Sequence, residues 1–236
     1  FNASSTQSIF LPNDIKDITF SPKGDRITYV QASGDDGLVV TATPDNKTKT
    51  VRLKMPITSW KLAWTDANNI YLSSAPSAHI SGLLYRINLS SGAFTKIFGP
   101  ASGLITKTNG TDVILSFSDP IERTLYSSIF NISTGKISQL DFKMIPDKCA
   151  WSKKSKDTVF CAEPLVFSSG IYPDDWHKVK VSFADTLVKI NLKSLAINSI
   201  TIPQTVDATE LFLSNDETIL FFLNKNDGSL WRVKLP

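Results

Sequence analysis

The residue types best suited to binding a ligand gather in one short stretch, where paired carboxylates stand beside large aromatic side chains. The stretch contains Tyr172, Asp174, Asp175, Trp176 and His177. Trp and Tyr combine a wide apolar surface with a polar edge, and carboxylates accept hydrogen bonds or bind cations. The pattern predicts a recognition surface, which we expect to include His79, the other histidine of the sequence.

A packing role is the alternative for the same stretch. Tyr172, Trp176 and Phe183 would then lie against the scaffold and hold their loop still, while Asp174 would cap a turn. The two interpretations differ in a measurable way, because packed aromatic side chains are buried whereas a recognition surface leaves Trp176 open to water.

Catalytic chemistry is not indicated by the sequence. The chain has no Gly-x-Ser-x-Gly elbow, no phosphate-binding glycine loop and no His-Glu-x-x-His motif. A glycoside hydrolase would need two facing carboxylates about 5 to 10 Å apart. The candidates, by position alone, are Asp174, Asp175, Asp185 and Asp207. Two histidines in separate loops are weak evidence for zinc, so we predict no enzyme, no cofactor and no bound metal.

The elements that must position the stretch follow a repeat of about 43 residues, which recurs five times. A polar turn between the first and second strands of each unit recurs at 21–29, 65–72, 109–115, 152–160 and 214–220. A second turn, between the third and fourth strands, is clearest at 87–92, 130–135 and 190–194. Short runs rich in β-branched and aromatic residues separate these turns, so the repeat predicts an all-β, five-bladed β-propeller.

The predicted blades are 17–56, 57–100, 101–142, 143–203 and 204–236, forming a single domain. The last blade has only three strands of its own. Residues 7–11 are prone to form a strand, so we expect this N-terminal segment to supply the fourth and close the ring. Such a strand would cover an open backbone edge that otherwise invites aggregation.

Residues 164–184 form an insertion of about 18 residues between the second and third strands of the fourth blade. Insertions on a rigid scaffold are common sites of function. We expect the insertion to share one acidic face with the matching loops, whose polar residues are Asp35, Asp36, His79, Asp119, Glu122 and Asp227. That face would attract a cationic segment or Ca²⁺, or else consist of ordinary polar turns.

The two cysteines bear on the compartment. If the 152–158 turn is symmetric about Ser155, Cys149 faces Cys161 across the hairpin, within disulfide range. A disulfide would indicate an oxidising compartment, and two buried thiols are the alternative.

The composition and net charge of the chain also bear on which kinds of partner it binds. The chain has 236 residues, of which 42% are hydrophobic, and a net charge of +3 with basic residues scattered among acidic ones. Nucleic-acid binding would call for a clustered basic face, so it is not expected. No run of residues is apolar and long enough to span a bilayer. The sequence begins at Phe1 with a polar stretch typical of a flexible stalk, which is compatible with a domain tethered to a membrane by its N-terminus.

A family resemblance adds to these observations. Residues 21–29, Ser-Pro-Lys-Gly-Asp-Arg-Ile-Thr-Tyr, resemble the blade signature of TolB-type and WD-like propellers, which implies the fold and is silent on function. Segments 148–152, 161–164, 172–176, 207–209 and 226–231 are similar to uncharacterised, membrane-anchored envelope propellers of candidate-phyla bacteria. That similarity implies an extracytoplasmic propeller with an N-terminal anchor and implies no activity.

We therefore expect a non-enzymatic, extracytoplasmic β-propeller that docks a protein or peptide at the cell envelope. A glycan-binding propeller is the main alternative, because Trp176 and Tyr172 could stack on a sugar beside the two aspartates. A glycoside hydrolase is a more distant one.

Overall fold

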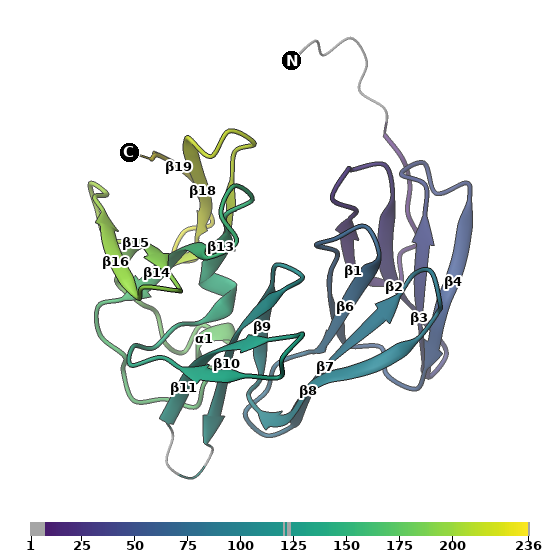
Figure 1. Cartoon of the computed structure of the whole chain (residues 1–236), viewed down its shortest axis with the longest axis horizontal. Coiled ribbons are helices and arrows are strands. Elements are labelled where there is room, and N and C mark those ends of the chain that lie inside the picture. Colours follow the sequence, from purple (N-terminus) through teal and green to yellow (C-terminus); the bar gives the residue numbers. More distant parts are fainter. Residues whose placement is uncertain (1–7, 120, 122–123, 236) are drawn as a thin grey trace. The chain divides into compact units, whose positions relative to one another are not determined.

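The computed structural model describes residues 8–119, 121 and 124–235, and it is built almost entirely from antiparallel strands (Figure 1). The first sheet contains β1 (Ile15–Phe20), β2 (Ile27–Ser33), β3 (Asp36–Ala42) and β4 (Lys49–Met55). The second contains β5 (Trp60–Ala63), β6 (Asn69–Ser74), β7 (Ser81–Asn88) and β8 (Phe94–Ser102). The third contains β9 (Ile105–Thr108), β10 (Asp112–Asp119), β11 (Thr124–Asn131) and β12 (Ile137–Gln139).

The remaining strands form two further sheets. The fourth contains β13 (Cys149–Trp151), β14 (Thr158–Pro164), β15 (Asp185–Asn191) and β16 (Ala196–Ile200). The fifth contains β17 (Ala208–Leu213), β18 (Ile219–Asn224) and β19 (Leu230–Lys234). In every sheet the strands pair in chain order, one sheet for each sequence repeat. The predicted all-β class and five blades of a β-propeller are therefore confirmed.

The chain divides into two compact units. The first runs to Ala75 and includes Leu84–Phe98, and the second contains Pro76–Leu83 and Gly99–Pro236. The first unit thus carries the first sheet and most of the second, while the other sheets and the insertion belong to the second unit.

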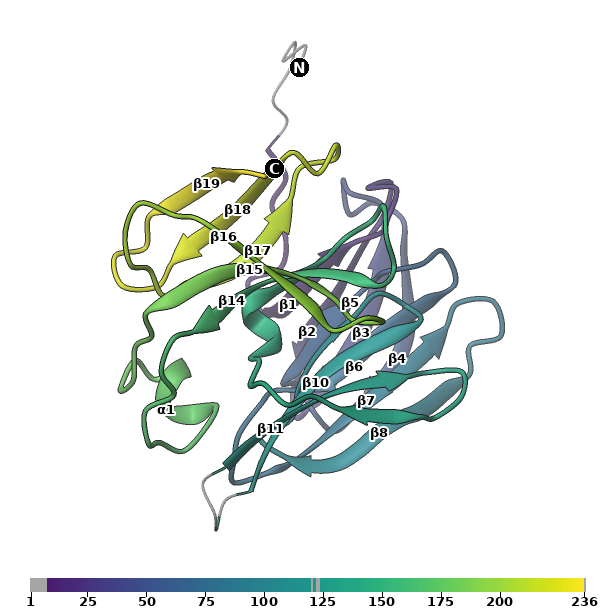
Figure 2. The ribbon, with the colours of Figure 1, turned by 60° about the vertical axis from the view of Figure 1, so that its left-hand side comes forward.

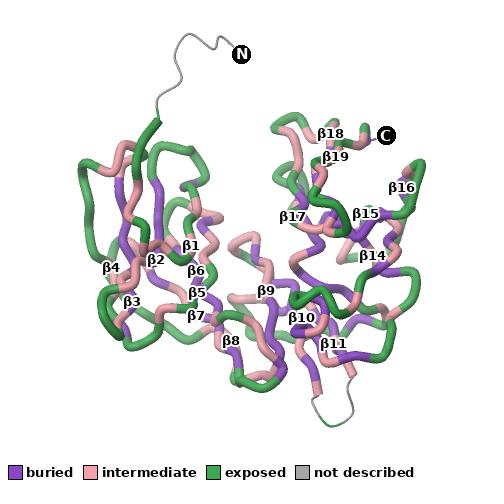
Figure 3. Tube along the Cα trace, turned by 180° about the vertical axis from the view of Figure 1, so that it is seen from behind, coloured by how far each residue is buried: buried purple, intermediate pink, exposed green. Residues whose placement is uncertain are grey.

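Runs of successive buried residues on the inner strands, such as β2, β3 and β6, produce the core of the first unit. Two tryptophans, Trp60 and Trp64, pack with Val30, Val39 and neighbouring aliphatic residues between the first two sheets. Tyr29 lies in a second cluster on the other face of the first sheet. The strand β2 buries Ile27, Thr28, Tyr29 and Val30 in succession, because both faces of the first sheet are covered, and such inner strands are largely purple in Figure 3.

The second unit has its largest apolar cluster between the fourth and fifth sheets, which lie side by side in Figure 2. Phe160 and Leu187 of the fourth sheet pack there against Leu220 and Phe222 of the fifth. A second cluster joins the third sheet to the other face of the fourth and surrounds the two cysteines.

The N-terminal segment differs from the prediction. The fifth sheet has three strands, and the described residues 8–12 form no strand, so the expected closing strand at 7–11 is wrong for these residues. Gln7 lies outside the described residues. Leu11 packs instead against the cluster around Tyr29 in the first unit, because its apolar side chain finds a partly buried site there.

The predicted cysteine pair is confirmed. Cys149 on β13 faces Cys161 on β14, and the two sulfurs form a disulfide. Trp151 faces Val159 in the same register, as symmetry of the turn about Ser155 requires. Both cysteines are buried in the cluster between the third and fourth sheets.

Removing the disulfide should cost modest stability. Cys149→Ser/Cys161→Ser is expected to lower the free energy of unfolding by about 1–3 kcal/mol, because the bridge closes a short loop that the hairpin already closes. Urea unfolding followed by tryptophan fluorescence checks this value. Thiol titration of unreduced protein provides the control, and two free thiols in that assay would contradict the assignment.

Candidate functional site

The insertion connects β14 to β15 in the second unit and contains the short helix α1 (Asp174–His177) (Figure 1). Its aromatic residues fold back onto the third blade. Tyr172, Trp176 and Phe183 share a buried cluster with Ile105 of β9 and Leu125 of β11. The insertion is therefore a packed element of the second unit rather than a free loop.

This packing decides between the two interpretations of the aromatic stretch. Trp176 is 1% exposed and Tyr172 is 4% exposed. The expectation that these two side chains form an open recognition surface is wrong, because both pack against the third blade and hold the insertion in place. Neither ring is presented to a sugar, so stacking of a glycan on them finds no support.

A buried lysine, Lys148, lies at the centre of this support. Its Nζ atom is 2.6 Å from an oxygen of Asp185 and 2.5 Å from an oxygen of Asp207, and it also donates to the carbonyl of Ala208 at 3.0 Å. The Lys148 side chain is 0% exposed. The 3-10 helix η1 (Pro146–Lys148) places it at the start of the fourth blade, and the aspartates begin β15 and precede β17. One ammonium group thus joins the fourth and fifth blades.

The same network reaches the insertion through Trp176. The indole Nε1 of Trp176 donates to both oxygens of Asp207 at 3.1 and 3.2 Å, and the Lys148 Nζ atom lies 5.0 Å from the Trp176 ring centre. The backbone amide of Phe183 also donates to Asp207. Lys225 approaches the same tryptophan, with its Nζ atom 5.0 Å from the ring centre.

Asp185 and Asp207 differ in their electrostatic surroundings and in their hydrogen bonds. Burial raises the pKa of Asp185 even though Lys148 and the amide of Ala208 oppose the rise. One Asp185 oxygen, Oδ1, has no hydrogen-bond partner among the described residues, whereas both oxygens of Asp207 accept several. Because Asp185 and Asp207 are 4% and 1% exposed and share one ammonium, their position is that of a structural ion pair rather than of catalytic acids in an open cleft.

Asp174 anchors a second loop. Its carboxylate accepts the amide of Ala78 at 2.6 Å and the hydroxyl of Ser77 at 3.3 Å, and it pairs with Lys178 at 3.2 Å. Burial opposes the charged form, but these contacts outweigh it and hold the pKa of Asp174 below its usual value. The loop after β6 is thereby fixed to α1.

Gly103 permits this close approach. Its amide donates to the carbonyl of Ser77, and its φ of +63° is a conformation that side-chain-bearing residues rarely adopt. A Cβ atom at this position would lie 2.9 Å from the carbonyl oxygen of Tyr172, which is too close.

The expected acidic character of the insertion is not seen. Asp175 accepts the amide of Ile171 and lies 3.4 Å from the Nζ atom of Lys180. Asp174 and Asp175 are therefore both paired with lysines whose side chains are 62% and 67% exposed, so the solvent meets cations here.

Of the other predicted residues, the two histidines lie on α1 and on the loop fixed to it, and the described acidic residues lie in other turns or at strand ends. His177 is exposed, with its Nε2 atom 3.1 Å from Asp147, and His79 is exposed on the loop that Asp174 holds. Among the described residues, no group of three His, Cys, Asp or Glu could hold a metal ion. Asp119 ends β10, and Asp227 binds the backbone and hydroxyl of Ser229 in its own turn. Asp35 and Asp36 belong to the first unit, and Glu122 lies outside the described residues.

Sequence reasoning missed the side chains that the insertion does expose. Leu165, Val166 and Val179 are 66%, 72% and 66% exposed, and Ile80 on the anchored loop is 64% exposed. Val179 has a φ of +59°, a conformation that is unusual and strained for a β-branched residue. We use the name insertion face for these exposed side chains taken together, namely Ile80, Leu165, Val166, Lys178, Val179 and Lys180.

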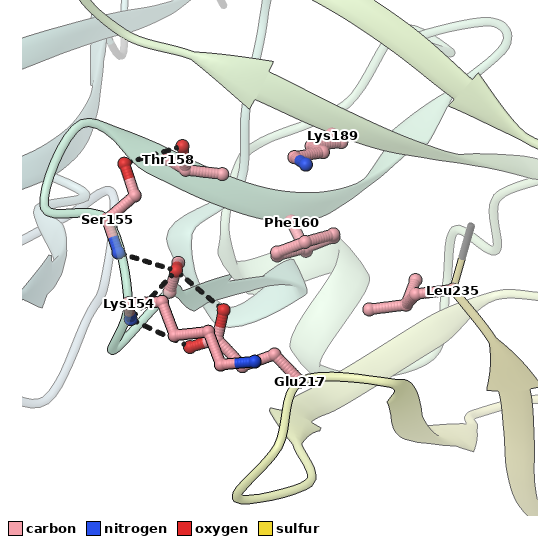
Figure 4. A pocket seen from close by; sticks show the side chains of 8 residues that line it. Lys154, Ser155, Thr158, Phe160, Lys189, Glu217 and Leu235 are labelled. Atoms are coloured by element: carbon pink, nitrogen blue, oxygen red, sulfur yellow. Dashed lines mark hydrogen bonds between the residues drawn. The ribbon is translucent and has the colours of Figure 1, made fainter.

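A separate pocket of about 220 Å³ lies between the turn after β13 and the turn after β17 (Figure 4). Phe160, Lys189 and Leu235 line one part of it. Glu217 lines another part and accepts the amides of Lys153 and Lys154 and the hydroxyl of Ser152. These hydrogen bonds outweigh the effect of burial and lower the pKa of Glu217.

Comparison with known proteins identifies the fold and no family. The chain matches no family model and no curated protein sequence. It is similar to the solved structure of TolB from Acinetobacter baumannii, with a TM-score of 0.65 and 12% identity over 93% of this chain and 51% of the TolB chain. The chain thus spans about half the length of that protein.

Other structural neighbours have diverse roles. A chain of the nidogen–laminin complex gives a TM-score of 0.59 at 8% identity, over 94% of this chain and 76% of its own length. The tricorn protease gives 0.57 at 10% identity, over 94% of this chain and 25% of its own. Likeness at these identities shows a TolB-like β-propeller fold and leaves the activity open. No helix among the described residues is long and apolar enough to cross a membrane.

Replacing the buried lysine should destabilise the second unit strongly. Lys148→Met leaves two buried carboxylates without their cation, and we expect a loss of about 3–5 kcal/mol in the free energy of unfolding. Chemical denaturation measures the loss. Lys189→Met, an exposed lysine of the same blade, is the matched control and should change stability by less than about 0.5 kcal/mol. Equal effects of the two substitutions would contradict the central role of Lys148.

Asp174 should make an acid-sensitive contribution to stability. Because its pKa is lowered in the folded protein, the stabilisation is present above the pKa of free aspartate, about 3.9, and is lost as the pH falls through the lower folded value. Asp174→Asn should cost about 1–3 kcal/mol at pH 7. Urea unfolding of both proteins between pH 7 and pH 3 should show the difference shrinking with acid, and a constant difference would refute the assignment.

Proposed function

We propose that this protein is a non-enzymatic β-propeller that docks a protein or peptide partner through the insertion face, on the outer side of a membrane at the cell envelope. The observation that supports the proposal most directly is that different side chains of the insertion are buried and exposed. Its aromatic and acidic side chains hold it in place, while its aliphatic and basic side chains face the solvent.

Rigidity supports a docking role. The Trp176–Asp207–Lys148 network and the contact of Asp174 with Ala78 fix the backbone of the insertion before a partner arrives. A surface that is already ordered loses less conformational entropy on binding. Loops held by a rigid scaffold are frequent binding sites in proteins.

The chemistry of the insertion face favours a protein partner over a sugar. Leu165 and Val166 expose aliphatic side chains in succession, and the strained Val179 lies between the exposed Lys178 and Lys180. Exposed apolar residues next to charges are typical of protein interfaces. Strained backbone is also found more often at functional sites. Because Tyr172 and Trp176 are buried, no specific observation supports a glycan-binding role.

Two observations support a location outside the cytoplasm. The disulfide between Cys149 and Cys161 is the kind of bond that persists in oxidising compartments. The fold is also similar to that of TolB. The N-terminal anchor and the relation to candidate-phyla envelope propellers remain part of the proposal and rest on the sequence resemblance.

The insertion face can be tested by substitution. Leu165→Ser/Val166→Ser should weaken binding to a partner captured by cross-linking in envelope membranes by about tenfold or more, because the apolar contacts are lost. Leu195→Ser/Ile197→Ser removes two exposed aliphatic residues from the β15–β16 hairpin of the same blade and is the matched control. The proposal is wrong if both variants bind like the parent.

The same proteins on a glycan array provide the competing measurement. Saturable binding to a sugar that is lost in the Leu165→Ser/Val166→Ser variant would favour the glycan alternative. Release of free sugar from such a ligand would show that the protein is a glycoside hydrolase.

A further inference from the structure

Among the described residues the fifth sheet has three strands, and its third strand is exposed. In the other four sheets the third strand, β3, β7, β11 or β15, buries at least three of its residues. The five residues of β19 alternate between exposed and intermediate, and none is buried. In the part of the chain that the structure describes, β19 pairs with β18 alone and forms the edge of its sheet.

The ladder shows which backbone groups face this edge. Leu235 donates its amide to Thr218, and Asn224 donates its amide to Ser229, at the two ends of the β18–β19 hairpin. Because hydrogen bonding alternates along an antiparallel pair, Trp231 and Val233 also turn their amides toward β18. The amide and carbonyl groups of Leu230, Arg232 and Lys234 therefore point to the open edge.

One face of the fifth sheet has a distinct chemistry. Leu223 faces Leu230 across the ladder, and these side chains are 37% and 63% exposed. Phe212, which is 50% exposed, stacks on Phe221. The same face continues with exposed basic residues on β19, because Phe221 faces Arg232 and Ile219 faces Lys234.

The pocket described above adds positive charge at the C-terminal end of β19. Leu235, the residue after β19, lines this pocket together with Lys154 and Lys189 (Figure 4). Glu217 is the one acidic residue of the lining, and its carboxylate is engaged by backbone amides and Ser152. The open edge thus runs from an apolar end at Leu230 to a basic end near Lys234.

The positive charge of Arg232 and Lys234 favours some binding partners of the edge over others. Antiparallel pairing of β19 with a second copy about Arg232 would set arginine against arginine, and charged edge residues of this kind discourage self-association. The first 13 residues of the chain contain no Asp or Glu, so they do not complement Arg232 and Lys234. A segment with acidic side chains opposite these two residues and an apolar one opposite Leu230 matches the edge.

We propose that the open edge of β19 accepts an extended segment of a partner protein, in which acidic and apolar residues alternate, as a fourth strand of the fifth blade. Backbone hydrogen bonds to Leu230, Arg232 and Lys234 give the affinity, and the acidic side chains give the orientation. This site is separate from the insertion face and does not depend on the role proposed for it.

A synthetic peptide serves as the probe, with the sequence acetyl-Thr-Glu-Val-Glu-Val-Leu-Thr-amide. In antiparallel register its glutamates lie opposite Lys234 and Arg232, and its leucine lies opposite Leu230. Hydrogen exchange of the full chain should slow at the amides of these three residues when the peptide binds. The amides of Trp231 and Val233, already paired with β18, should change little and are the internal control.

Charge and backbone contributions are tested separately. Arg232→Glu should weaken binding of the glutamate peptide by about tenfold and favour a peptide with lysines in place of the glutamates. Lys193→Glu makes the same change of charge in the exposed β15–β16 turn and should have no effect. Methylating the peptide nitrogen opposite Arg232 should abolish binding, since it removes a donor to the edge.

Three results would overturn the proposal. One is a glutamate peptide that gives no protection at the edge, or binds no better than the lysine peptide. Another is protein that forms dimers and protects Leu230, Arg232 and Lys234 without any peptide. The third is slow exchange at these amides in the free monomer that is lost when residues 1–11 are deleted, because the chain itself would then occupy the edge.

Discussion

The second unit depends on one buried charge, the ammonium of Lys148. It lies between Asp185 and Asp207, on the segments that begin β15 and precede β17, so a single side chain connects the fourth blade to the fifth. Trp176 extends this connection to the insertion through its hydrogen bonds with Asp207. Because breaking a buried ion pair costs far more than breaking an exposed one, the arrangement ties the position of the insertion to the packing of two blades.

This coupling explains why the most conspicuous residues of the sequence are not the ones that meet the solvent. The insertion needs large aromatic side chains to form a core of its own against the third blade, and it needs Asp174 to hold the loop around Ala78. What remains exposed is smaller and less distinctive, namely Leu165, Val166 and Val179 with flanking lysines. The docking surface that we propose takes its shape from these buried residues and would make its contacts through the exposed ones.

The fold could be predicted from the sequence because its signals are local. Polar turns such as 21–29 and 214–220 recur at a fixed period, and symmetry about Ser155 was enough to pair Cys149 with Cys161. The site could not be predicted in the same way. Whether Trp176 is buried depends on Ile105 and Leu125, about 50 to 70 positions away along the chain, and Lys148 shows no local sign that it will meet two aspartates.

The position of the disulfide has a consequence for damaged protein. The turn at 153–156 is exposed and contains three lysines, so it offers a natural target to proteases that cleave after basic residues. Cys149 and Cys161 lie on either side of that turn. A cut within it would leave the two pieces linked through sulfur, and they would come apart as separate chains only after a reductant cleaved the disulfide.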